Sequence, residues 1–236
     1  VVLSRFTSPT ESTDSETTTD AAGRYTFAGL DTADNIVYVT SVRHAGVIYA
    51  SGMLRLSAGQ SVVADLTVYE TTTDQSAVRV ASRGIVLTEV DRETGAITCL
   101  DIFAIAFDSD RTLVQGDDGR TLRFPIPANA SEVTPGTGFS FGAPSIDGST
   151  VFATGPLYPG ETTATLTWIV PYDGDQIDIE LANAYPTGSI RVLVPQDGSV
   201  PDAITVNGDG FIDDGVVTIG EVEYRVWSVD LNDATS

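Results

Sequence analysis

Apolar and polar residues alternate with a period of two along much of the chain. The alternation is clear at residues 64–68, 164–168 and 177–181, and again at Val222, Tyr224 and Val226. It is typical of β-strands that bury one face and expose the other. No window shows an apolar stripe with the period of a helix. We therefore predict an all-β protein of about a dozen or more short strands.

Turn signals separate the alternating segments at intervals of about 8–12 residues. They combine Gly with Ala, Pro or Asp, as turns require, at Ala58-Gly59, Gly116–Gly119, Pro159-Gly160, Asp173-Gly174 and Asp197-Gly198. No sequence repeat of fixed length is present, which argues against a propeller or a solenoid. The pattern instead favours antiparallel β-sandwiches.

A polar, Thr-rich segment at residues 68–76 separates two runs of predicted strands. The chain of 236 residues is long enough for two domains, each with a sizeable core. We predict one antiparallel β-sandwich over residues 1–72 and a second over residues 73–236, with a polar C-terminal tail. The opening residues VVLSRF have the character of the middle of a strand, so we expect the first domain to be truncated at its N-terminus.

The chain is strongly acidic. It has 33 Asp and Glu residues against 12 basic residues, all of them Arg, which gives a net charge of −21. Such a surface repels nucleic acid and anionic lipid headgroups. No apolar run approaches the roughly 20 residues of a membrane-spanning helix. We expect no nucleic-acid partner, and attachment to a membrane only through a segment outside this sequence.

Two acidic segments are candidates for calcium binding. FDSDR and GDDGR bring together Asp108, Asp110, Asp117 and Asp118. They could ligate calcium in a loop or form solvated turns, and we favour turns because neither segment has a recognisable calcium-loop pattern. NGDGFIDDG, residues 207–215, lacks the bidentate Glu of a calcium loop and favours a turn for the same reason. The sequence thus predicts no cofactor and no established metal site.

Two patterns carry weak catalytic signals. GFSFG, residues 138–142, matches a nucleophile elbow, but no helical pattern and no His follow it, which favours a Gly-rich loop. Cys99 and His44 could form a nucleophile–base pair. Cys99 shares a strand face with Phe103, Ile105 and Phe107, which favours a buried structural Cys, and His44 lies at a predicted turn.

Asn129 begins a glycosylation sequon. Paired carboxylates carry no signal in so acidic a chain, and we predict a protein that is not an enzyme.

The stretch TTTDAAGRYTFAGL, residues 17–30, predicts a β-hairpin around Asp20–Gly23 with Tyr25 and Phe27 on one face. It resembles the second hairpin of carboxypeptidase regulatory-like domains, a family of transthyretin-like β-sandwiches. The matching residues are Thr19, Asp20, Gly23, Arg24, Tyr25, Phe27 and Leu30.

The following segment, residues 37–74, is similar to a variant of that domain in predicted bacterial cell-envelope proteins. The residues that carry this similarity are Gly46, Val47, Tyr49, Ser51, Val68, Tyr69, Glu70 and Thr72. The similarity extends into the second half of the chain, where it is carried by the segments LRFPIPANA, LYPGETTATLTWIVPYDG and YPTGSIRVLVP. The resemblance implies a second β-domain and an extracytoplasmic location, secreted or anchored at the cell surface. It carries over no catalytic residue, because the peptidase ligands and base have no counterpart here.

Three hypotheses for function follow. The first is a non-catalytic extracytoplasmic module that is structural or binds protein partners in the cell envelope. The second is an accessory subunit of a membrane-associated complex, which would show an open strand edge or a large apolar patch. The third is a hydrolase that uses the acidic loops, which would need converging carboxylates with perturbed pKa values.

Overall fold

The computed structural model describes all residues except 137–138, 173–178, 201–203, 205, 207 and 232–236. The described residues form 16 strands in four sheets, mostly antiparallel, and no helix. The all-β prediction is thereby confirmed. The chain divides into two compact units, Val1–Thr71 and Thr72–Ser236. No helix of the described part is long and apolar enough to cross a membrane.

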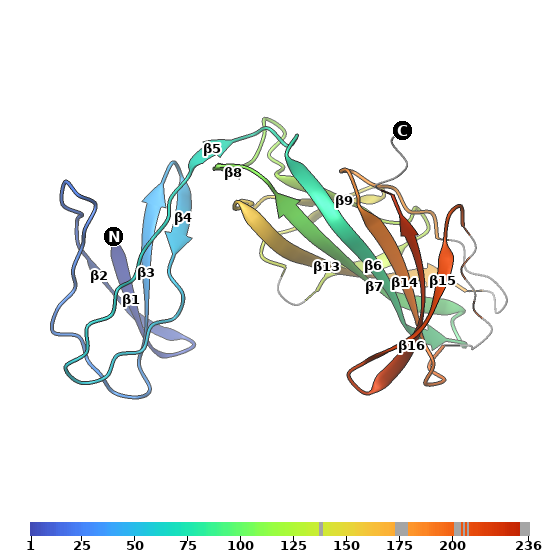
Figure 1. Cartoon of the computed structure of the whole chain (residues 1–236), viewed down its shortest axis with the longest axis horizontal. Coiled ribbons are helices and arrows are strands. Elements are labelled where there is room, and N and C mark those ends of the chain that lie inside the picture. Colours follow the sequence, from blue (N-terminus) through green and yellow to red (C-terminus); the bar gives the residue numbers. More distant parts are fainter. Residues whose placement is uncertain (137–138, 173–178, 201–203, 205, 207, 232–236) are drawn as a thin grey trace. The chain divides into compact units, whose positions relative to one another are not determined.

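The first unit contains a four-stranded antiparallel sheet (Figure 1). Its strand order is β2-β1-β3-β4, with β1 at Val2–Ser8, β2 at Glu11–Glu16, β3 at Val37–His44 and β4 at Val47–Ala50. Ala45 and Gly46 join β3 to β4 with φ values of +47° and +83°. Two consecutive residues with positive φ allow a two-residue hairpin loop that matches the twist of its strands.

Segments without regular strands complete the core of this unit. Leu3, Ile36 and Tyr38 form the buried cluster, and Phe27, Leu30, Leu54 and Leu56 pack against it. Residues 64–68 and the arms of the predicted 17–30 hairpin are not strands, so those two predictions are wrong. The turn itself is present: Asp20 Oδ1 accepts the N–H groups of Ala22 and Arg24.

The side chains of the 17–30 segment pack on the unit instead of pairing as a ladder. Tyr25 and Phe27 stack edge to face with their ring centroids 6.1 Å apart. The Tyr25 hydroxyl donates to the carbonyl of Ala64 and also lies 3.3 Å from Thr40 Oγ1. The aromatic residues thus lie on one side, as predicted, but they hold two irregular segments against the sheet.

The second unit is built on a seven-stranded sheet of order β10-β13-β7-β6-β14-β16-β15 (Figure 1). All neighbours are antiparallel except β14 and β6, which are parallel. This parallel pair departs from the purely antiparallel prediction. The strands are β6 (Val78–Asp91), β7 (Ala96–Phe107), β10 (Ser131–Pro135), β13 (Gly160–Pro171), β14 (Ser189–Pro195), β15 (Ile212–Ile219) and β16 (Val222–Asp230).

One face of this sheet packs against a three-stranded sheet of order β11-β12-β9 to form the main core. These strands are β11 (Ser145–Asp147), β12 (Thr150–Ala153) and β9 (Leu122–Pro125). The remaining strands, β5 (Glu70–Thr72) and β8 (Arg111–Leu113), form a two-stranded sheet. The alternation at 164–168 and at 222–226 lies in β13 and β16, as predicted. Ile179–Leu181 are not in a strand, and residues 177–178 lie outside the described part.

A bulge in β6 determines which of its residues face this core. Val80 pairs with Ile105 and Ser82 pairs with Ala104, so Ala81 is the extra residue. In a regular strand Val80 and Arg83 would point to opposite faces. Because one residue is inserted between them, both are buried on the core side. The bulge therefore places the Arg83 side chain inside the core.

Candidate functional site

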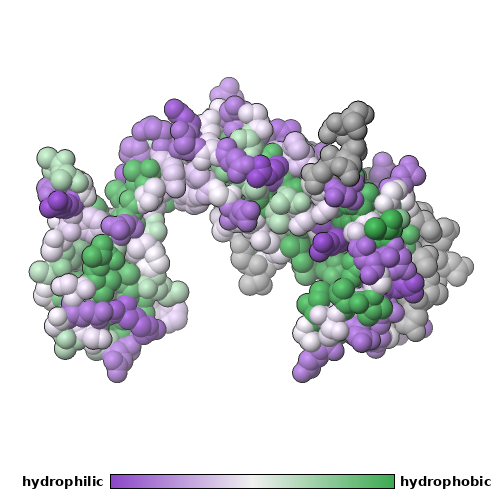
Figure 2. All heavy atoms as spheres, viewed as in Figure 1, coloured by the Kyte–Doolittle hydropathy of each residue, from purple (hydrophilic) through white to green (hydrophobic). Residues whose placement is uncertain are grey.

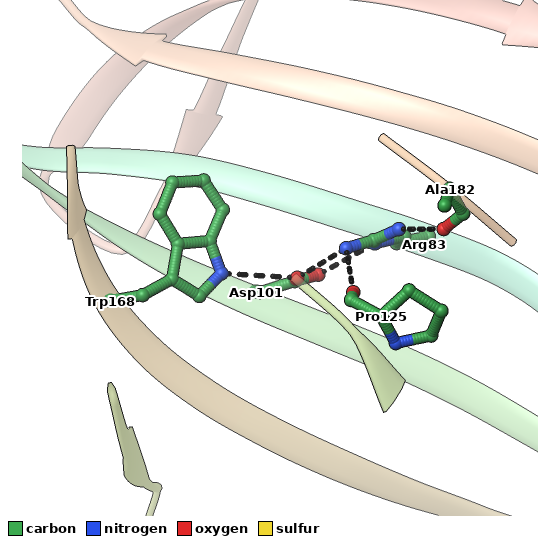
Figure 3. Close-up of polar contacts among 5 residues, drawn as sticks. All are labelled: Arg83, Asp101, Pro125, Trp168 and Ala182. Atoms are coloured by element: carbon green, nitrogen blue, oxygen red, sulfur yellow. Dashed lines mark hydrogen bonds and ion pairs between the residues drawn. The ribbon is translucent and has the colours of Figure 1, made fainter. Parts of the chain in front are cut away.

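The most concentrated polar chemistry of the second unit lies inside its core, between Arg83 of β6 and Asp101 of β7 (Figure 3). Arg83 Nε donates to Asp101 Oδ1 at 3.0 Å and Arg83 Nη2 donates to Oδ2 at 2.7 Å. The side chains are 1% and 0% exposed. Two parallel hydrogen bonds between a guanidinium and a carboxylate form a strong, geometrically specific pair.

Three further groups complete what we call the Arg83 cluster. Trp168 of β13 donates its indole N–H to Asp101 Oδ2 at 3.2 Å. Arg83 also donates to the backbone carbonyls of Pro125 and Ala182, both at 2.9 Å. The cluster thereby joins three strands of the large sheet to β9 and to the segment before β14 (Figure 3). The guanidinium carbon lies 4.6 Å from the centre of the Phe103 ring.

The electrostatics of the cluster are those of a buried, compensated pair. Burial raises the pKa of the Asp101 carboxyl, while the hydrogen bonds and charge of Arg83 and the bond from Trp168 act in the opposite direction. Because the Arg83 donors and both Asp101 oxygens are bonded within the protein, the cluster holds layers together. We see in it no group positioned to attack a substrate.

A small pocket adjoins the cluster. Arg83, Phe103 and Phe124 contribute to its lining, together with Arg123 and Tyr185. It has room for about one water molecule. The Tyr185 hydroxyl accepts the backbone N–H of Arg123 at 3.1 Å, and burial raises the pKa of this tyrosine. A pocket of this size suits a water or a single small group.

The four calcium candidates are separately engaged or exposed. Asp108 pairs with Arg79, and Asp110 lies 3.9 Å from Arg111 Nε. Asp118 Oδ1 accepts the backbone N–H of Arg120 at 3.1 Å. Asp117 is exposed. Across the described residues, no three His, Cys, Asp or Glu side chains come together as a metal-binding group. Our interpretation of these segments as solvated turns that do not bind calcium stays a prediction.

The catalytic candidates Cys99 and His44 belong to different units of the chain. Cys99 is 0% exposed, as predicted, and burial followed by the charge of Asp101 raises its pKa to about 12. The thiolate that a nucleophile requires is therefore suppressed. His44 ends β3 beside the predicted turn, and its Nε2 lies 3.1 Å from Glu70 Oε1.

The remaining motifs lie in loops and turns. Ser140 of GFSFG is exposed in a segment without a strand, although Gly138 lies outside the described residues. In NGDGFIDDG, the Phe211 N–H donates to the Gly208 carbonyl at 3.2 Å and closes a turn, while Asn207 lies outside the described part. Asn129 is exposed at a turn.

A surface that the sequence motifs did not indicate lies along β15, the last strand of the seven-stranded sheet. Four of its aliphatic side chains are unusually exposed: Ile212 by 63%, Val216 by 55%, Val217 by 40% and Ile219 by 55%. Val217 and Ile219 are paired with Tyr224 and Val222 of β16, whose side chains share their face. Alternation of apolar and polar residues gave no signal here, because apolar residues occupy both faces of the strand.

Comparison with known proteins gives no further assignment: no protein-family model and no curated protein sequence matches the chain.

Proposed function

We propose that the chain is a non-catalytic extracytoplasmic module of a cell-envelope protein, serving a structural or protein-binding role. The observation that carries the proposal is the Arg83 cluster, in which the most buried charged groups bond to each other and to backbone carbonyls of the fold. A catalytic site instead directs such groups towards a cavity where a reacting atom can sit. The suppressed thiolate of Cys99 supports the same interpretation.

The finer assignment, a carboxypeptidase regulatory-like domain followed by a second β-sandwich, is also a proposal. It is supported by contacts among residues that carry the resemblance. The Tyr49 hydroxyl donates to the carbonyl of Tyr69 at 2.9 Å, and their rings lie 6.1 Å apart. Asp20, Gly23 and Arg24 form the turn of the resembling segment, where Gly23 has a φ of +77°.

Protease accessibility in intact cells tests the location. Trypsin cleaves after Arg, and Arg43, Arg55 and Arg92 are exposed. We expect trypsin to cleave the protein in intact cells while a cytoplasmic marker survives. Protection in intact cells, with cleavage only after permeabilisation, would refute an extracytoplasmic location at the cell surface.

A hydrolase screen tests the non-catalytic character. The purified protein, incubated with esters, peptides and oligosaccharides, should produce no turnover above buffer. Turnover that disappears in the Asp108→Asn or Asp117→Asn variant would replace the proposal with an acidic-site hydrolase.

The open β15 edge favours a second candidate, an accessory subunit of a membrane-associated complex. A subunit needs an apolar surface or a free strand edge through which it is held. Purification from native membranes in mild detergent should then yield a complex of defined stoichiometry. Recovery as a free chain under the same conditions would leave only the first proposal.

A further inference from the structure

The strand edges of the two larger sheets differ in how they are protected. Proteins protect exposed edges with charged side chains, Pro, bulges or very short strands, because free N–H and C=O groups accept another strand. All six residues of β2 are polar and exposed. β10 ends at Pro135 and its register is interrupted by a bulge. β4 has four residues, of which Val47 and Tyr49 are buried.

Within the described part of the chain, the features that protect β15 lie at its start. The bulge between Asp213 and Gly215 interrupts its pairing with β16, and Asp213 is held by Arg225 at 2.5 Å. From Gly215 to Ile219 the register with β16 is regular and the exposed residues are mainly aliphatic. In an antiparallel pair, alternate residues direct their backbone N–H and C=O groups away from the partner strand. This stretch therefore offers backbone groups and aliphatic side chains at the same edge.

The segment that precedes β15 packs elsewhere in its described part. Val200 is buried in the main core, and Ile204, Val206 and Phe211 pack against that core. Hydrophobic residues are also visible over the seven-stranded sheet in Figure 2, interspersed with hydrophilic ones.

Charge determines which kind of strand would suit this edge. The hairpin of β15 and β16 and its flanking turns carry one basic residue, Arg225, which is already paired with Asp213. The exposed acidic residues are Asp209, Asp213, Asp214, Glu221, Glu223 and Asp230. A second copy would bring the same acidic residues and a further net charge of −21 to the contact. Like charges disfavour that pairing, whereas a basic strand is attracted.

We propose that the Gly215–Ile219 edge of β15 binds an extended segment of another protein, in which aliphatic residues alternate with Lys or Arg. The segment adds a strand to the sheet. Its aliphatic side chains lie beside Val217 and Ile219, and its basic side chains lie near the acidic flanks. This inference rests on the proposed binding or accessory role and specifies the chemistry of the partner.

A peptide titration tests it. The probe is a capped heptapeptide of alternating Val and Lys, with N-methyl groups on the amides of one edge to prevent self-association. Binding is followed by amide chemical shifts and hydrogen exchange of the ¹⁵N-labelled protein. We expect shift changes and slowed exchange centred on Gly215–Ile219, and weaker binding as salt is raised.

Two peptide controls separate strand pairing from simple charge attraction. The same heptapeptide with Glu in place of Lys should not bind. A heptapeptide with all amides methylated keeps its charges but lacks the backbone N–H donors that strand pairing requires, and it should not bind either. Equal binding of either control would overturn the proposal, as would the absence of any response to the Val-Lys peptide.

Matched variants locate the site. Val217→Thr with Ile219→Thr keeps β-propensity and net charge while reducing the apolar surface, and it should weaken binding by about tenfold. Ile146→Thr changes an aliphatic residue of similar exposure on β11 and should leave binding unchanged. Equal effects of the two variants, or a dimer in which Gly215–Ile219 is protected before peptide is added, would refute the assignment. Neither result bears on trypsin accessibility in cells, so failure here is distinguishable from failure of the proposed location.

Discussion

Arg83 and Asp101 lie on adjacent strands and share two parallel hydrogen bonds of 3.0 and 2.7 Å deep inside the second unit. Taking both charges out of water is costly, so such a pair adds little net stability compared with an apolar pair of similar volume. Its main consequence is interdependence: each side chain makes the burial of the other tolerable.

Removal of one partner should therefore be severe. We expect Arg83→Met to lower the free energy of unfolding by about 3–5 kcal/mol, because Asp101 is left buried without its counter-charge. The double variant Arg83→Met, Asp101→Leu should recover part of that loss; Trp168 Nε1 then lacks its acceptor. Urea denaturation of the native chain, the single variant and the double variant measures the three free energies of unfolding. The exposed pair Arg79–Asp108 provides the control, since Arg79→Met should have a much smaller effect. A double variant as unstable as the single one would contradict the compensation.

The thiol of Cys99 should be unreactive in the native state. Burial raises its pKa to about 12, so both access and thiolate are lacking at pH 8. We expect a thiol reagent in excess to modify Cys99 only as the protein unfolds, with complete labelling in urea. Full labelling of the folded protein within seconds would show that the strand opens locally or that the burial is wrong.

Calcium should stabilise the protein no more than sodium chloride of equal ionic strength. Asp108 and Asp118 already have protein partners, and exposed carboxylates respond mainly to screening. A specific site would instead stabilise the folded state by RT ln(1 + [L]/Kd), so the melting temperature would keep rising with the logarithm of the calcium concentration above Kd. Melting curves in calcium, magnesium and matched sodium chloride test this. A shift of several degrees that is unique to micromolar calcium and lost in Asp117→Ala would establish a metal site.

Acid should destabilise the turns capped by aspartates. Hydrogen bonds from the Thr94 side chain and backbone and from the Glu93 N–H lower the pKa of Asp91 below its ordinary value of 3.8. Hydrogen bonds from neighbouring groups also lower the pKa values of Asp31, Asp74, Asp197 and Asp213. A lowered pKa in the folded state means that the contribution is fully present above pH 3.8 and is lost as the pH falls through the folded value.

The Asp91→Asn variant isolates this effect, because an amide oxygen still accepts hydrogen bonds but does not titrate. Unfolding free energies at pH 5.5 and 2.5 should show a smaller acid-induced loss in the variant than in the native chain. An equal or larger loss in the variant would show that the Asp91 carboxylate does not stabilise its turn.

The sequence contained half of the information needed to find the Arg83 cluster. Asp101 alternates in phase with Cys99 and Phe103, so alternation places this carboxylate on the buried face, where it needs a partner. Its partner could not be found by the same rule. The bulge at Ala81 changes the phase of β6, and alternation alone places Arg83 on the face opposite to Val80.

The local sequence pattern gave a wrong prediction where tertiary side-chain contacts take the place of hydrogen-bonded strand pairing. The 17–30 segment has the alternation and turn of a hairpin, yet Tyr25 and Phe27 bond and pack across the unit. For β15, the sequence indicates the strand itself but not its exposure. Its sequence has the β-propensity of a strand, but exposure depends on its place at the end of the sheet, which only the pairing of distant strands determines.

The parallel pairing of β6 with β14 has a consequence for biosynthesis. Arg83 is in register with Ile190, so the two strands at the middle of the large sheet are supplied by regions more than a hundred residues apart. During vectorial synthesis, β6 and β7 emerge together, and the free side of β6 stays unpaired until the ribosome has delivered β14. Non-local pairing of this kind slows folding and leaves an aggregation-prone intermediate. A nascent chain halted after β13 should therefore associate with chaperones that bind exposed strands, and extension past β14 should release it.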